Sequence, residues 1–78
     1  MREVVVYLAR ALVDEPDRIT VSEYRGGRGL TYEVRAAPDD VGKLVGRGGR
    51  TVKSLRKLVK AAAPAGQRVE VEVLAEGE

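Results

Sequence analysis

The first segment of the chain places its hydrophobic residues at helical spacing. Within residues 3–13, apolar side chains occupy positions i, i+3, i+4, i+7 and i+8 counted from Val4. This spacing predicts an amphipathic helix with one apolar face on the core. The following Asp-Glu-Pro-Asp stretch, residues 14–17, ends the helix because proline disfavours a helical residue before it. The expected core face consists of Val4, Tyr7, Leu8, Ala11 and Leu12.

Three later segments alternate between hydrophobic and polar residues, which is the period of a β-strand. Residues 19–25 alternate, with Ile19 and Val21 expected to point inward. Residues 30–36 alternate in the same way, and the glycine-rich turn between the two segments predicts an antiparallel hairpin. A last strand is predicted at residues 69–73, where valines alternate with charged residues. The inward side of the second strand is expected to be Leu30, Tyr32, Val34 and Ala36.

Two helices are predicted between the second and third strands. Pro38 and two aspartates open a short helix over roughly residues 39–45, because proline is favoured in a first turn and acids at its positive end. A longer helix runs from about Arg50 to Ala63 and stops at Pro64. The predicted order is α-β-β-α-α-β, an α+β fold in a single domain of residues 1–78.

The composition excludes several classes of function. The chain has no cysteine and no histidine, which excludes disulfides, thiolate nucleophiles, His-based proton transfer and the common zinc sites. Ser22 and Ser54 lie in no nucleophile motif, so we expect no enzyme, no cofactor and no metal. No apolar run approaches the roughly 20 residues of a membrane span, and no signal-peptide pattern follows the start. We therefore expect a cytoplasmic protein without membrane contact.

The charges are segregated along the chain. The formal net charge is only +2, yet residues 42–60 contain seven basic residues and no acid, while the rest carries seven basic and twelve acidic residues. Such a basic segment on an otherwise acidic domain indicates a site for a polyanion. The seven basic residues are Lys43, Arg47, Arg50, Lys53, Arg56, Lys57 and Lys60.

The predicted helix 50–63 separates into two faces. Its apolar residues fall within an arc of about 120°, and its basic residues fall within a similar arc on another side. A solvated face is the ordinary interpretation of such charges. Here, however, all of them are positive, and like charges at i,i+4 destabilise a helix. The apolar arc consists of Val52, Leu55, Leu58, Val59 and Ala62, and the basic stripe of Arg50, Lys53, Arg56, Lys57 and Lys60.

A glycine-rich loop, Gly46-Arg47-Gly48-Gly49, precedes the basic stripe. Without side chains, its backbone N–H groups are open to close approach by a phosphate, and the N-terminus of the next helix favours an anion. A tight turn between two helices also favours glycine, so both interpretations remain. A P-loop is excluded because it needs Gly-Lys-Ser/Thr after a strand, and here Gly49 is followed by Arg50. A dinucleotide fingerprint is excluded because the loop joins two helices and lacks the last glycine.

Residues 41–55 resemble the signature of the KH domain, namely an aliphatic pair, G-x-x-G, and an aliphatic residue three positions on. Leu44-Val45, the loop and Val52 occupy these places. The element order resembles the type II, bacterial arrangement, in which an extra helix and strand precede a β-α-α-β core. Nearly the whole chain, including residues 7–13, is similar to the small bacterial single-KH proteins of the KhpA family. The resemblance implies a type II KH fold with a three-stranded sheet and three helices packed on one face.

The resemblance also implies a function and a site. A KH domain grips about four single-stranded RNA nucleotides with its G-x-x-G loop, while the bases lie in an aliphatic groove. Val41 and Leu55 are placed along or beneath that groove, and residues 25–29 would form a variable loop at its far edge. The implied role is post-transcriptional regulation or RNA chaperoning. The RNA-binding residues are expected to be Gly46, Arg47, Gly48, Gly49, Arg50, Lys53, Leu44, Val45, Val52, Lys43 and Lys57.

Two alternative functions stay open at this point. One is a protein-interaction module on a KH fold, although such modules can lose the loop glycines and basic residues that this chain keeps. The other is DNA binding, either to a single strand or by two helices imitating helix-turn-helix, but the flanking strands favour a single strand over a duplex groove.

The first predicted helix also raises the question of a protein partner. Val6, Ala9 and Val13 form a second apolar ridge, which we expect to point away from the core face. Either this ridge tucks under the sheet or the final segment, or it pairs with a second copy or another KH-containing protein. Pairing would set two short grooves side by side and raise affinity through effective concentration.

Overall fold

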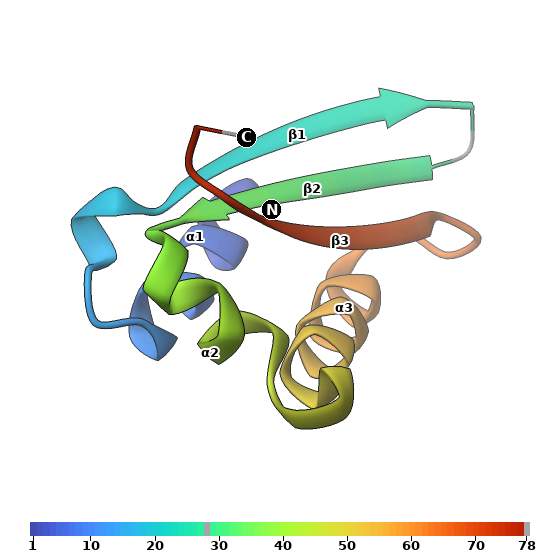
Figure 1. Ribbon diagram of the computed structural model, residues 1–78. Helices are drawn as coiled ribbons and strands as arrows, with labels where there is room; N and C mark the ends of the chain where they lie inside the picture. The colour runs from blue at the N-terminus through green and yellow to red at the C-terminus, as the bar shows by residue number, and fades with distance from the viewer. Residues whose placement is uncertain (28, 78) are drawn as a thin grey trace.

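The computed structural model describes residues 1–27 and 29–77 and contains a three-stranded sheet with a layer of helices beneath it (Figure 1). Short 3-10 turns at Pro16–Arg18, Pro38–Asp40 and Arg47–Gly49 join the main elements. The predicted order is confirmed, and each element begins and ends within one or two residues of its expected bounds. The elements are α1 (Arg2–Leu12), β1 (Thr20–Gly26), β2 (Gly29–Ala36), α2 (Val41–Val45), α3 (Arg50–Ala62) and β3 (Arg68–Ala75).

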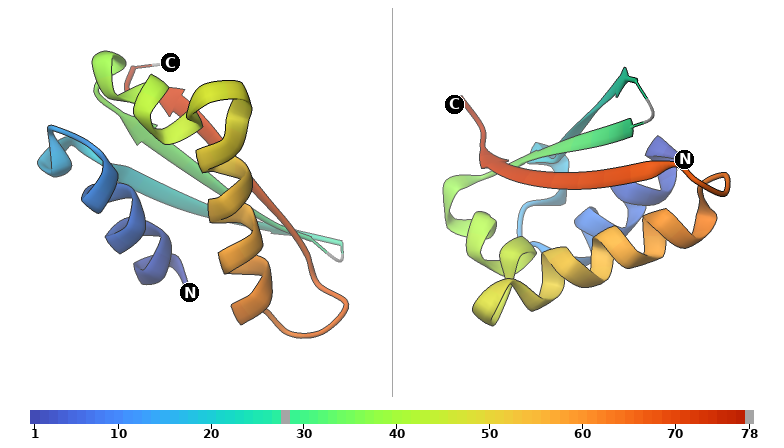
Figure 2. Two further views of the ribbon diagram at one scale, coloured as in Figure 1. Left: turned by 90° about the horizontal axis from the view of Figure 1, so that it is seen from below. Right: turned by 90° about the vertical axis from the view of Figure 1, so that its right-hand side faces the viewer.

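The sheet has the order β1-β2-β3 and is mixed. β1 pairs antiparallel with β2 from Thr20 opposite Arg35 to Gly26 opposite Gly29, which confirms the hairpin. β3 pairs parallel with β2, with Gly29 beside Arg68. This parallel pairing requires a crossover, and α2 and α3 supply it across one face of the sheet (Figure 2).

The core lies between the sheet and the helices. The predicted inward residues of β1 and β2 are buried, because strand alternation turns them all toward the helix layer. All three helices lie on this one face (Figure 2), as predicted. No helix in the described part of the chain is long and apolar enough to cross a membrane. The buried hydrophobic residues include Val5, Ala9, Ile19, Val21, Leu30, Tyr32, Val34, Ala36, Leu44, Leu55, Val59, Val69 and Val71.

The core face predicted for α1 is wrong. Val5 and Ala9 are fully buried, whereas Val4, Tyr7 and Leu12 remain 45%, 74% and 42% exposed. Apolar residues of α1 lie on most sides of the helix, so their spacing alone could not predict which side packs against the sheet. The small Ala9 lets the helix backbone come close to the sheet, whereas the bulky Tyr7 points outward.

The second ridge of α1 lies inside rather than outside. Ala9 is fully buried, and Val6 and Val13 are partly buried and pack against the core. Of the two interpretations offered for this ridge, the one in which it tucks under the sheet is therefore correct. Val6, Ala9 and Val13 therefore belong to the packed side of α1.

A buried carboxylate fastens the end of α1 to the start of α2. The Asp40 side chain is 2% exposed, and its two oxygens accept the backbone N–H groups of Asp14 at 3.2 Å and Glu15 at 3.0 Å. The Lys43 ammonium lies 3.5 Å from the same carboxylate. Burial by itself raises the pKa of Asp40, but the two N–H donors and Lys43 outweigh it and hold the pKa below its usual value.

Replacing this buried carboxylate is expected to destabilise the fold. Asp40→Ala leaves two N–H groups unpaired and should lower the melting temperature at neutral pH by roughly 10 °C. Because the folded-state pKa of Asp40 is lowered, its contribution is complete above the unfolded-state pKa and disappears as pH falls through the folded value. The difference between wild type and variant should therefore shrink in acid. Asp39→Ala, at the exposed neighbouring carboxylate, is the control and should change little in thermal melts.

Candidate functional site

The glycine loop begins at a position that only glycine can occupy. Gly46 ends α2 with φ 77° and ψ 169°, a backbone region closed to other residues. A Cβ built there would lie 2.3 Å from Thr51 Oγ1 and 2.8 Å from the Thr51 backbone nitrogen. The chain therefore turns back tightly against the first turn of α3. This close contact fixes the direction in which the rest of the loop projects.

The remaining loop residues form an exposed turn before α3. Gly48 and Gly49 have φ of 65° and 79°, so three loop glycines are explained by backbone conformation alone. Their number is thus weaker support for a ligand than the sequence indicated. Arg47 and Gly48 are exposed; among the described residues, nothing lies within 4 Å of a Cβ built at Gly48 and no side chain caps the N-terminus of α3. The backbone here is open to an anion.

The basic stripe is exposed along α3 and largely unpaired. The exception is Arg56, whose guanidinium lies 3.8 Å from the Glu70 carboxylate. Within residues 1–27 and 29–77, no acid forms an ion pair with the other basic residues of the loop and stripe. Their charges are therefore free to attract a polyanion. These unpaired residues are Arg47, Arg50, Lys53, Lys57 and Lys60.

Lys43 differs from the other basic residues of the segment. Its ammonium pairs with Asp14 and with the buried Asp40, on the side of α2 that faces the end of α1. The hydrogen bond to Asp14 is the main cause that raises the pKa of Lys43, opposed by partial desolvation. The sequence analysis included Lys43 among the RNA-binding residues because segment 42–60 contains no acid. The two acids that pair with Lys43 lie outside that segment, Asp14 far away in the sequence and Asp40 three residues earlier. The structure places it in a structural ion-pair cluster.

The aliphatic residues of the signature form two groups, one buried in the core and one half-buried at the surface. Leu44 and Leu55 are buried, so they lie beneath any ligand and can support it only indirectly. Val41, Val45 and Val52 are half-buried, with Val52 packed against the core. Contact between α2 and α3 brings this set together below the loop.

A hollow of about 560 Å³ lies between the basic side of α3 and the edge strand β3. Arg56 and Lys60 line it from α3, and Arg68, Val69 and Glu70 from β3. The sequence pattern did not connect Arg68 or Glu70 with the site. Strand alternation predicts that Arg68 and Glu70 share one face of β3. Their position beside α3 depends on the parallel pairing of β3 with β2, which the sequence pattern does not reveal. The hollow continues the basic stripe away from the glycine loop.

The predicted variable loop lies near the other end of α3 from the glycine loop. Gly26 and Gly29 line a small hollow with Arg68, next to the start of β3. Arg28, the central residue of that loop, lies outside the described residues. Contact of this loop with a ligand stays a prediction.

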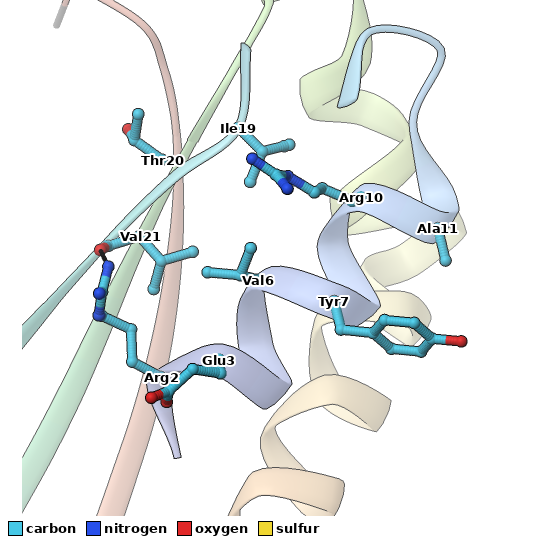
Figure 3. Close-up of a pocket in the computed structure, with 9 residues that line it drawn as sticks. All are labelled: Arg2, Glu3, Val6, Tyr7, Arg10, Ala11, Ile19, Thr20 and Val21. Carbon is cyan, nitrogen blue, oxygen red and sulfur yellow. Dashed lines mark hydrogen bonds between the residues drawn. The ribbon is translucent and has the colours of Figure 1, made fainter. Parts of the chain in front are cut away.

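A separate groove of about 760 Å³ lies between α1 and the edge strand β1 (Figure 3). Val6, Ile19 and Val21 line it, and the Arg2 guanidinium donates a hydrogen bond of 3.3 Å to the Val21 carbonyl oxygen. Arg2 thus forms a hydrogen bond with one backbone carbonyl group on the outer edge of β1. This groove contains no residue of the predicted site. In the described part of the chain, no three acidic side chains gather as a metal site would require.

A solved structure similar in fold supports this architecture. It is the crystal structure of Era in complex with MgGDPNP and nucleotides 1506–1542 of 16S ribosomal RNA. The TM-score is 0.64, with 18% identity, over 96% of this chain and 30% of that chain. At this identity the likeness concerns the fold alone.

Several relatives have a higher sequence identity to this chain than that structure does. RNA-binding protein KhpA of Caldanaerobacter subterraneus subsp. tengcongensis is 44% identical over 75 residues, which is 95% of this chain and all of the relative. RNA-binding protein KhpA of Mycobacterium tuberculosis is 46% identical over 69 residues, 88% of this chain and 86% of the relative. A family model described as "KhpA/KhpB, KH domain" matches residues 2–73. With its type II KH fold and its glycine loop, the chain belongs to the KhpA/KhpB family of KH domains.

Proposed function

We propose that residues 1–78 act as one KH domain that binds single-stranded RNA through the glycine loop and the basic stripe of α3. The observation that carries this proposal is the run of exposed cations from Arg47 to Lys60, of which Arg56 alone is paired with an acid among the described residues, beside an open glycine backbone. Relatives that match nearly the whole chain carry the name RNA-binding protein. The chain has no histidine or cysteine, and Ser54 on α3 lies in no nucleophile motif, so we propose binding rather than catalysis.

The loop acts on the RNA backbone. Exposed Gly48 lets a phosphate approach, and Arg47 and Arg50 supply charge-assisted hydrogen bonds to its oxygens. The positive end of the α3 dipole adds to this attraction. Lys53 continues the same path one turn further along the helix. About four nucleotides fit this arrangement in a KH domain.

The bases then lie over the half-buried valines and toward the hollow between α3 and β3. Val45 and Val52 offer an apolar surface, while Arg56 and Glu70 offer hydrogen-bonding groups to base edges. Such edges are accessible only when the strand is unpaired, which favours single-stranded over duplex RNA. Lys43 is omitted from the contact set because Asp14 and Asp40 already neutralise it.

Salt dependence tests this proposal directly. Titration with a short unstructured RNA should show about two to four phosphates neutralised, with a log-log slope near −0.7 for each contact. Lys53→Ala should weaken binding to all sequences alike and flatten the slope by about one contact. Lys43→Ala is the matched control, and its slope should equal that of wild type because that charge is already paired.

The same titration separates the alternatives. A flat salt response in wild type would remove the basic stripe from the mechanism and favour a protein-interaction module. Equal affinity for single-stranded DNA of the same sequence would show that no 2′-hydroxyl contact contributes. Stronger binding to duplex RNA than to a single strand would contradict the groove assignment.

We also propose a setting for this activity. One short groove binds weakly, so pairing with a second copy or another KH-containing protein supplies the additional affinity. The corresponding role is post-transcriptional regulation or RNA chaperoning in the bacterial cytoplasm. Crosslinking the protein to RNA in its native cells and sequencing the fragments identifies the targets.

A further inference from the structure

One acidic side chain lies among the cations of the hollow between α3 and β3. Glu70, which is 63% exposed, lines this hollow together with Arg56, Lys60, Arg68 and Val69. β3 lies next to α3 at this place (Figure 1). A carboxylate repels phosphate, so it weakens the attraction that the surrounding cations exert on RNA. Contact with a base, rather than with the RNA backbone, accounts for an acid at this position.

A purely structural role does not account for Glu70. Arg56 is the ion-pair partner that the described residues provide, with 3.8 Å between a guanidinium nitrogen and a carboxylate oxygen. This separation exceeds the length of a hydrogen bond, and both side chains are exposed. Ion pairs of this kind contribute little to stability. The Glu70 carboxylate therefore keeps its capacity to accept hydrogen bonds from a ligand.

The hollow places hydrogen-bond acceptors between donors. The two carboxylate oxygens of Glu70 only accept hydrogen bonds, whereas guanidinium and ammonium groups only donate them. Arg56 and Lys60 belong to α3, and Arg68 precedes Glu70 by two residues on β3, so both elements contribute donors. A ligand that satisfies these groups must present adjacent donors to the carboxylate and acceptors to the cations.

Guanine meets this requirement best among the four bases. Its N1–H and N2 amino groups lie side by side, so one carboxylate accepts from both, and its O6 and N7 accept from a guanidinium. Cytosine and adenine present one amino group beside a ring acceptor, which repels the second carboxylate oxygen. Uracil presents one N3–H between two carbonyl oxygens. These base edges are accessible to side chains in an unpaired strand.

The hollow lies within reach of an RNA strand held at the glycine loop. α3 begins at Arg50, and Arg56 lies about 9 Å further along the helix axis at 1.5 Å per residue. A strand of about four nucleotides that is gripped at the loop extends over this distance. The loop then positions the strand through its phosphates, and the hollow selects one of its bases.

We propose that Glu70 is a specificity-determining residue and that the hollow between α3 and β3 selects an unpaired guanine. Glu70 accepts hydrogen bonds from N1–H and the N2 amino group, and Arg56 donates to O6 or N7 of the same base. This inference rests on the proposed function and assigns a base preference to that RNA site.

Fluorescence anisotropy titration of the full chain with short labelled RNAs tests the proposal. An oligouridine with one central guanosine should bind roughly tenfold or more tightly than the same RNA with adenosine, cytidine or uridine at that position. Inosine differs from guanosine only by the missing 2-amino group. An RNA with inosine at that position should bind about fivefold or more weakly than the guanosine RNA, because one charge-assisted hydrogen bond is lost.

Glu70→Gln separates base recognition from structure and from general electrostatics. The amide keeps the side-chain shape but has one acceptor oxygen, so the preference for guanosine should fall roughly tenfold. Affinity for oligouridine should stay the same or rise, because a negative charge is removed near the RNA. Damage to the fold would instead lower both affinities.

Glu72→Gln is the matched control. Glu72 is an exposed acid two residues further along β3, and it is absent from the residues that line the hollow. This variant removes the same charge from the same strand and should keep the full preference for guanosine.

Three outcomes overturn the inference. Equal affinity for all four RNAs would remove base selection from the hollow. A preference for cytidine or another base would assign a different ligand to it. A preference for guanosine that survives Glu70→Gln would place the selecting residue elsewhere. Failure of the proposed function differs from all three, because wild type would then bind none of these RNAs even at low salt.

Discussion

The double substitution Arg47→Asp with Gly48→Asp is expected to abolish RNA binding while leaving the fold intact. Both residues are exposed, and nothing in the part of the chain that the structure describes lies within 4 Å of a Cβ built at Gly48. The change removes one phosphate donor and adds two negative charges where the RNA backbone approaches. Affinity for single-stranded RNA should fall at least roughly a hundredfold in a binding titration. Circular dichroism should give the wild-type spectrum.

A neutral variant separates charge from backbone effects. Gly48 has φ 65°, a left-handed conformation that aspartate and asparagine adopt more readily than other non-glycine residues. Arg47→Asn with Gly48→Asn therefore has a similar backbone cost without the negative charges. It should lose only the contribution of Arg47. Equal loss of affinity in both double variants would mean that loop conformation, rather than charge repulsion, controls binding.

Gly46→Ala is expected to be the most destabilising single change in the loop. The added methyl group would lie 2.3 Å from Thr51 Oγ1 and 2.8 Å from the Thr51 backbone nitrogen, at φ 77° and ψ 169°. Strain and clash together should lower the free energy of unfolding by about 3 kcal/mol or more. For a domain of this size, thermal melts should show a fall of more than about 10 °C. RNA affinity should also drop, because the loop can no longer turn back against α3.

Two comparisons check the cause of this effect. Gly48→Ala meets open space and has only the cost of a left-handed φ, about 1 kcal/mol. Gly46→Ala with Thr51→Ala removes the contact with Oγ1 but keeps the 2.8 Å contacts with the Cβ and the backbone nitrogen of residue 51, so it should recover only part of the stability. Full recovery in the double variant would show that the Thr51 side chain, and not the backbone conformation, requires glycine.

The strands, the helix order and the glycine loop were predictable from the sequence. Each depends on local chemistry: alternation turns Leu30, Tyr32 and Val34 to one face, and Pro64 ends a helix wherever the segment lies. The family signature at residues 41–55 is equally local, so the positions of the loop and the basic stripe follow from neighbouring residues alone. The parallel pairing of β3 with β2 was not predicted, because alternation within a strand does not determine which strand it pairs with or in which direction.

Tertiary structure decided the features that depend on which surfaces meet. The helical spacing of apolar residues on α1 was compatible with two different buried faces. The face with Val5 and Ala9 packs against the sheet, because the small Ala9 allows the helix to approach closely. From the sequence, Lys43 was expected to bind RNA. In the folded chain its ammonium group forms ion pairs with Asp14 and Asp40. Sequence periodicity reports which residues share a face, but only packing between distant elements determines whether that face is covered or free to bind.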